Sequence, residues 1–188
     1  MFRRAQWAVM GIVLLCGHAR GESYPQNWAA PVPMKNCADV IGLYQGSGEE
    51  AGEPTSALSL YSMLTPEPQT SEEDAKKTKA SALIDRVEIL NDGPATLVLH
   101  FRGATGEVAT LSYPARDCGA EGAVIDTYSG ETRGRDNPLT SREHETMTLG
   151  KAADGALIVL RHEHNSILFS PIGASSSHWV RYPAFKPD

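Results

Sequence analysis

Short apolar runs separated by turn residues dominate the chain from residue 83 onward. Runs of this length that are rich in β-branched residues and bounded by Gly, Pro, Asn or Asp are typical of strands. The pattern predicts strands at 87–90, 96–101, 108–113, 123–128, 146–149, 157–163, 167–171 and 179–182. Between them, residues 129–142 are rich in Gly, Arg, Asp and Asn and are predicted to form a long loop. Strands that follow one another at such short intervals favour an antiparallel meander.

Helical periodicity is confined to the part of the chain before these strands. Ala57, Leu60, Tyr61 and Leu64 fall on one face at helical spacing, which predicts a short helix over 57–64. The next segment, 67–79, places acidic residues before lysines, an order that suits the helix dipole. A solvent-facing helix and a loop both fit it. The fold class we predict is mainly β: a curled antiparallel meander or partly open barrel with one short N-terminal helix.

The first nineteen residues have the pattern of a bacterial export signal. Arg3 and Arg4 precede an apolar run over 8–15, which is too short to span a bilayer. Small residues at Gly17 and Ala19 form a site for signal peptidase. We therefore predict a signal peptide at 1–19 and a periplasmic or secreted protein.

Cys16 offers the alternative of a lipid anchor, and with it attachment to the envelope membrane. Lipidation requires a small residue directly before the cysteine, whereas this chain has Leu15 there. Residues 20–36, which contain several prolines, are predicted to be an extended leader. A single β-rich domain is then expected over 37–185.

Composition and charge limit the classes of partner that we expect. The chain has 188 residues, 41% of them hydrophobic and 21% charged, as in an ordinary globular protein. Its net charge is −6, and loss of Arg3 and Arg4 with the signal peptide would make it more negative. A negative surface without a basic patch repels phosphate backbones, so we expect no nucleic-acid partner.

Cleavage of the signal leaves two cysteines, Cys37 and Cys118. An oxidising compartment and a single remaining pair indicate one disulfide between them. Two free thiols are the alternative. The residues are too far apart in the chain for a redox-active Cys-x-x-Cys site.

The strand around residue 163 carries the residues best suited to metal binding. His162 and His164 lie on one face of a strand because side chains alternate, and His144 belongs to a strand that can pair nearby. Two histidines together with a carboxylate can bind zinc or copper. The alternative is a solvated strand face without metal. No hydrolase elbow or phosphate-binding loop is present, so we predict a non-catalytic protein without a cofactor.

Short motifs at the two ends of the domain resemble those of a loose group of small proteobacterial lipoproteins. These proteins open with Cys-x-x-x-x-Gly-x-Tyr and close with Trp-Tyr-Arg-Phe or a close variant. Here the opening contains Cys37, Gly42 and Tyr44, and the closing motif is Trp179-Val180-Arg181-Tyr182. The resemblance implies a location in the cell envelope and a similar fold, and it implies no activity.

The residues of these motifs can also be interpreted from their physical properties alone. A glycine permits close approach of the backbone, and a tyrosine supplies a large apolar ring with a polar tip. Trp179 and Tyr182 are expected to close the sheet beside its first strand, or to be plain core residues. The favoured function is a module that binds an envelope protein or component. A lipocalin-like carrier of a small apolar ligand is the alternative.

Overall fold

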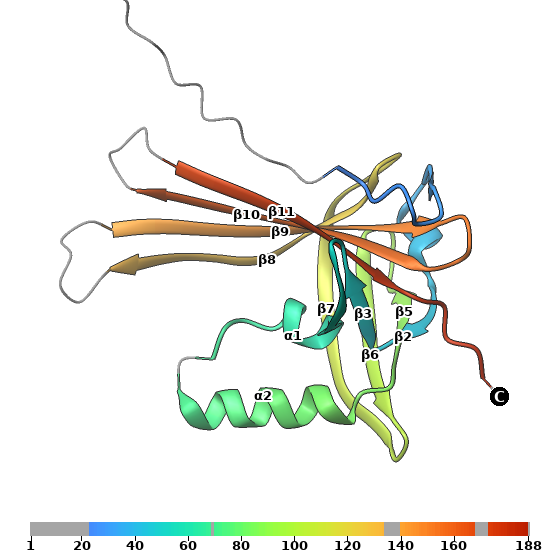
Figure 1. Cartoon of the computed structure of the whole chain (residues 1–188), viewed down its shortest axis with the longest axis horizontal. Helices are drawn as coiled ribbons and strands as arrows, with labels where there is room; N and C mark the ends of the chain where they lie inside the picture. Colours follow the sequence, from blue (N-terminus) through green and yellow to red (C-terminus); the bar gives the residue numbers. More distant parts are fainter. Residues whose placement is uncertain (1–22, 69, 134–139, 168–172, 188) are drawn as a thin grey trace, which may run out of the picture.

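A curled antiparallel sheet forms most of the molecule (Figure 1). The computed structural model describes residues 23–68, 70–133, 140–167 and 173–187. The strands are β1 (Pro31–Val32), β2 (Gly42–Gln45), β3 (Ser47–Glu50), β4 (Glu53–Ser59), β5 (Arg86–Asn91), β6 (Thr96–Gly103), β7 (Gly106–Gly119), β8 (Gly122–Arg133), β9 (Thr140–Ala152), β10 (Leu157–Ile167) and β11 (Gly173–Tyr182). The helices are η1 (Cys37–Val40), α1 (Leu60–Leu64) and α2 (Ser71–Leu83). The predicted mainly β class is confirmed.

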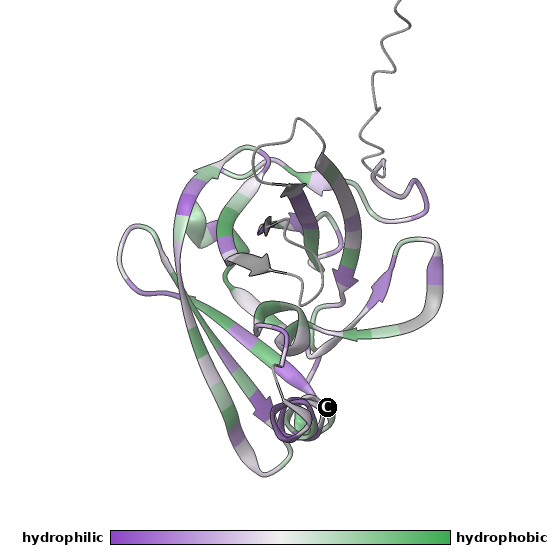
Figure 2. Ribbon diagram, turned by 90° about the vertical axis from the view of Figure 1, so that its left-hand side faces the viewer, coloured by the Kyte–Doolittle hydropathy of each residue, from purple (hydrophilic) through white to green (hydrophobic). Residues whose placement is uncertain are grey.

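The strands form a meander that curls back on itself. Their order is β2-β5-β6-β7-β8-β9-β10-β11-β3-β4, with each neighbouring pair antiparallel. Just after β11, Phe185 donates to the carbonyl of Leu43, and Gln45 donates to the carbonyl of Pro183, both at 2.9 Å. These bonds bring the chain end beside β2. The result is a partly open barrel, and Figure 2 shows the sheet curling round.

Alternation of side chains explains why β5 to β7 bury one face. Along β6, every second residue is buried, and Leu97, Leu99 and Phe101 are fully enclosed. Val87 and Ile89 of β5 lie beside them on the same face. This half of the barrel is therefore filled by side chains.

The helix predicted over 57–64 is shorter than expected. Residues 53–59 form β4, so α1 begins only at Leu60 and is capped by Ser59. The segment left open between helix and loop is α2, whose Thr70 and Glu73 form a capping box. Acidic residues in the first turn add to this because they face the positive end of the helix dipole. The fold therefore has a thirteen-residue helix beyond the one short helix predicted.

The long loop predicted at 129–142 is wrong at both ends. β8 continues to Arg133 and β9 begins at Thr140, with Ser129 paired to His144. Gly and charged residues disfavour a strand locally, but pairing with an adjacent strand overrides that preference. Most of the strand predicted at 167–171 lies outside the described residues.

The described part of the predicted leader packs on the barrel and contains a turn in which Trp28 donates to the carbonyl of Pro25. β1 pairs with the end of β9, with Val32 opposite Lys151. The ring of Tyr24 meets that of Trp179 edge-on at 5.1 Å, beside Ala156 and Ile158 in a small second core. Packed chain therefore begins before Cys37, the residue where the domain was expected to start.

Candidate functional site: a polar four-stranded projection

Four strands run on past the rest of the barrel (Figure 1). β7 pairs with β8 only as far as Ile125, and β3 pairs with β11 only at Val180 and Arg181. Beyond these points the sheet consists of 126–133, 140–146, 161–167 and 173–178, which we call the projection. The side chains and backbone groups of the projection lie outside the filled core of the barrel.

The inward face changes character where the projection begins. Met147 of β9 and Val159 of β10 are fully buried. The next inward positions on these strands are Glu145 and Arg161, followed by Glu163. The same face is thus apolar in the barrel and charged in the projection.

Arg161 is the centre of the charged face. Its Nη2 lies 2.9 Å from Glu145 Oε2 and 2.9 Å from Glu163 Oε1. Thr127 donates to Glu145 Oε1 at 2.9 Å, and Ser176 donates to Glu163 Oε2 at 3.2 Å. Only 15% of the Glu145 side chain is exposed, against 31% for Arg161. Each charge therefore sits in a hydrogen-bonded network, as partly buried charges require.

Burial and the two carboxylates act on Arg161 in opposite directions. Burial disfavours the charged guanidinium, but the hydrogen bond to Glu145 and the charges of Glu145 and Glu163 outweigh it and raise the Arg161 pKa. Glu143 is also an inward position of β9. The projection's inward face therefore carries three carboxylates for one guanidinium among the described residues.

The connection between α1 and α2 lies close to this face. Lys77 of α2 donates to the carbonyls of Thr65 at 2.8 Å and Pro66 at 3.1 Å. Burial lowers the Lys77 pKa, and Arg161 adds to that effect while nearby carboxylates oppose it. Tyr113 of β7 donates to the carbonyl of Leu64, and burial raises its pKa to about 12. The helices are therefore fastened beneath the projection (Figure 1).

The three histidines predicted as metal ligands lie on the opposite, outward face. His164 and His144 are direct cross-strand partners, His162 lies 2.8 Å from Ser177 Oγ, and His144 lies 3.6 Å from Asp126. The described part of the chain contains no group of three or more His, Cys, Asp or Glu arranged to hold a metal. Metal binding here stays a prediction, which titration of Zn(II) or Cu(II) into metal-free protein would test.

The same alternation shows what the sequence reasoning overlooked. The sequence pattern singles out the histidines and not Glu145 and Glu163, which adjoin them in the chain. Because adjacent side chains face opposite ways in a strand, the two glutamates lie on the inward face with Arg161. Alternation along β9 and β10 was the available signal.

Cys37 and Cys118 lie at disulfide distance, with their Cα atoms 5.1 Å apart. Cys37 is buried at the start of η1, and Cys118 lies near the end of β7. The bond thus ties the segment that enters the barrel to the hairpin that leads into the projection. Cys16 lies outside the described residues.

The opening glycine and tyrosine fit together as a unit. The Tyr44 ring lies over Gly42, and a Cβ built on Gly42 would come within 2.7 Å of the Tyr44 hydroxyl. That hydroxyl donates to the carbonyl of Val40 at 2.7 Å, and burial raises the Tyr44 pKa to about 12. Gly42 is therefore needed for packing, and Tyr44 is a core residue.

The closing motif divides between the two faces of β11. Tyr182 is buried with its ring over Gly48, whereas Trp179 belongs to the outer aromatic cluster with Tyr24. Arg181 pairs with Glu49 at 2.8 Å and also with Asp154. The motif thus joins β11 to β3 and to the turn between β9 and β10.

The ion pair of Arg181 predicts a pH effect. The hydrogen bond from Arg181 lowers the Asp154 pKa, so this pair stabilises the fold above the carboxyl's unfolded pKa of about 4, and the contribution is lost as pH falls through the lower folded value. We expect Asp154→Asn to cost under about 1 kcal/mol at pH 7, because solvent screens the pair. The difference should vanish at acidic pH when urea unfolding of both proteins is compared. A pH-independent difference would contradict the assignment.

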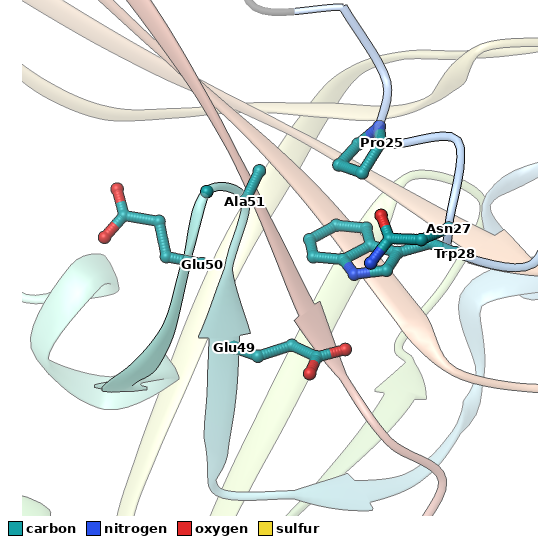
Figure 3. Close-up of a pocket in the computed structure, with 7 residues that line it drawn as sticks. Pro25, Asn27, Trp28, Glu49, Glu50 and Ala51 are labelled. Atoms are coloured by element: carbon teal, nitrogen blue, oxygen red, sulfur yellow. The ribbon is translucent and has the colours of Figure 1, made fainter.

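A small pocket lies on the outside of the barrel, between the leader and the turn after β3 (Figure 3). Its volume is about 240 Å³. It is lined by Pro25, Asn27, Trp28, Glu49, Glu50, Ala51 and Gly52. The close-up shows Glu50 pointing away from the Trp28 ring. The pocket is smaller than typical small-molecule sites of about 300–1,000 Å³.

No helix among the described residues is long and apolar enough to cross a membrane. Comparison of the chain with models of known families, with curated proteins and with solved structures finds no match.

Proposed function

We propose that this chain is an exported, non-catalytic binding module of the bacterial cell envelope, and that it takes its partner on the projection. The observation that carries the proposal is the change along β9 and β10 from buried apolar residues to a hydrogen-bonded charged face. Because side chains fill one half of the barrel, we expect the partner to bind on the part of the sheet that extends beyond it. Charged and hydroxyl groups arranged there suit a polar partner better than an apolar one.

Three features support the proposed location in the cell envelope. They are the export pattern over 1–19, the resemblance of the end motifs to small proteobacterial lipoproteins, and the cysteine pair, which suits an oxidising compartment. Anchoring through Cys16 is part of this proposal only as an alternative to cleavage after Ala19. Mass measurement of the mature N-terminus distinguishes the two.

The second candidate is a carrier of a small apolar ligand. The partly open barrel favours it, because related architectures hold ligands in their interior. Against it, the inward side chains of β5 and β6 fill the described interior, with Leu99 and Phe101 fully buried. The pocket beside Trp28 lies outside the barrel.

Native mass spectrometry of the full chain, purified from the envelope of its own host, separates these functions. We expect a complex of defined stoichiometry with a protein or a polar envelope component. Glu163→Gln should weaken this complex because it removes a carboxylate from the charged inward face of the projection. Arg142→Met, on the outward face of the same strand pair, is the matched control.

Other outcomes would contradict the proposal. A co-purifying lipid or other apolar small molecule in place of a polar partner would favour the carrier. A chain that purifies without any bound component would remove the support for a binding module. Circular dichroism and unfolding midpoints of both variants show whether any loss reflects unfolding.

A further inference from the structure

The outer edge of β11 is weakly protected over residues 173–177. Exposed edges invite pairing with another strand, and proteins usually block them with charges, prolines or bulges. The β8 edge has a bulge at 126–128 and an ion pair between Arg116 and Asp126. β4 contains Pro54 next to Glu53. In contrast, residues 173–177 read Gly-Ala-Ser-Ser-Ser and contain none of these features.

The backbone of this edge faces outward in a regular array. The Trp179 carbonyl accepts a hydrogen bond from Ala51 of the β3–β4 turn, so it points away from β10. Backbone groups alternate along a strand, and the β10–β11 register is regular from Leu157–Tyr182 to Ser166–Gly173. Gly173, Ser175 and Ser177 therefore direct their N–H and C=O groups to the same open side. Within the described residues, no strand pairs with them there.

The surroundings of the edge select for basic side chains. Ser176 is the inward residue of β11 opposite Glu163, and its short side chain donates to that carboxylate. A strand added beside β11 would lie about 10 Å from β10, two strand spacings away. A long lysine or arginine side chain can cross over the serine and meet Glu163. The inward carboxylates outnumber Arg161, and the whole chain carries a net charge of −6.

We propose that the partner of the projection binds by adding an extended strand to the β11 edge at residues 173–177, with basic side chains at alternate positions over the inward face. This proposal rests on the proposed function, for which it names the mode and chemistry of binding. Backbone hydrogen bonds supply affinity in such strand addition, and alternate side chains supply specificity. A second copy of this chain is disfavoured as the occupant because its own edge would bring further carboxylates to this face.

The test uses the full chain and a short synthetic peptide in which lysine and threonine alternate, with a glutamate–threonine peptide as the charge control. Ser175→Pro removes an outward N–H while leaving the bonds to β10, because proline is tolerated on an edge facing solvent. We expect it to weaken binding of the lysine peptide at least about tenfold. Ser175→Ala keeps the backbone donor, so its affinity should stay within about twofold of wild type. Fluorescence anisotropy measures the binding of each peptide to wild type, to Ser175→Pro and to Ser175→Ala.

Glu163→Gln tests the electrostatic part of the proposal. It should weaken the lysine peptide about threefold and reduce the dependence of binding on salt. Equal binding of both peptides to wild-type protein would overturn the selection for basic side chains. Equal binding of the lysine peptide to Ser175→Pro and wild type would overturn strand addition at this edge. A dimer of wild-type protein that Ser175→Pro converts to monomer would assign the edge to a second copy instead.

Failure of this proposal is distinguishable from failure of the proposed function. If Ser175→Pro, folded with an unchanged unfolding midpoint, still forms the native complex from host envelope, the edge proposal is wrong and the binding module stands. If wild-type protein forms no such complex, the proposed function is wrong whatever the peptides do.

Discussion

Loss of the Cys37–Cys118 disulfide is expected to lower the free energy of unfolding by about 4–5 kcal/mol. The bond closes a loop with a sequence separation of 81, and a crosslink of this span removes much conformational freedom from the unfolded chain. Cys37 is also buried beside the barrel. Urea unfolding of wild type and of Cys118→Ala, followed by circular dichroism, measures the difference.

The double variant is the internal control for this prediction. Because each single variant already breaks the same bond, Cys37→Ala with Cys118→Ala should be close in stability to Cys118→Ala. Reductant should destabilise wild type and leave the variants unchanged. The prediction fails if both thiols of unreduced wild type can be alkylated, or if a linked peptide is missing under non-reducing mass spectrometry.

Truncation of Tyr182 is expected to have the next largest effect. Its ring is fully buried over Gly48, where β11 meets β3, and its hydroxyl donates to the Met63 sulfur at 2.9 Å. Tyr182→Ala should cost about 3–5 kcal/mol, because it loses buried apolar surface and leaves a cavity at the closure of the barrel. Thermal or urea unfolding gives the value.

Tyr182→Phe isolates the hydroxyl from the ring. A thioether is a weak acceptor, so removing the hydroxyl should cost no more than about 1.5 kcal/mol. If the two variants were equally destabilised, the hydroxyl contact would matter more than the packing argued here. If Tyr182→Ala were nearly neutral, the ring would not be part of the closure.

The alternation of apolar and polar residues predicted those strands well in which one face is buried along the whole strand. The alternation in β5 and β6 is visible in the sequence, because Val87, Ile89, Leu97, Leu99 and Phe101 fall on one face. It failed at 129–133 and 140–142, where glycine and charged residues pair between β8 and β9. Strand pairing there depends on a neighbouring strand that a local pattern does not contain.

The helices show a similar division. The order of acids before lysines supported the helix alternative for 67–79, and the structure adds a capping box of Thr70 and Glu73 at the start of α2. In contrast, the helix was predicted to begin too early because Ala57 fits the face of Leu60, Tyr61 and Leu64, although it belongs to β4. Pairing of residues 57–59 with β3 decided in favour of the strand.

The sequence by itself determined the β class and the pairing of Cys37 with Cys118 as the expected disulfide. These follow from composition, periodicity and residue chemistry, which are local properties. Only the tertiary structure decided that Glu145, Arg161 and Glu163 share one face and that the β11 edge is left open. Both depend on which strands are neighbours and on where their pairing stops, and long-range register sets these.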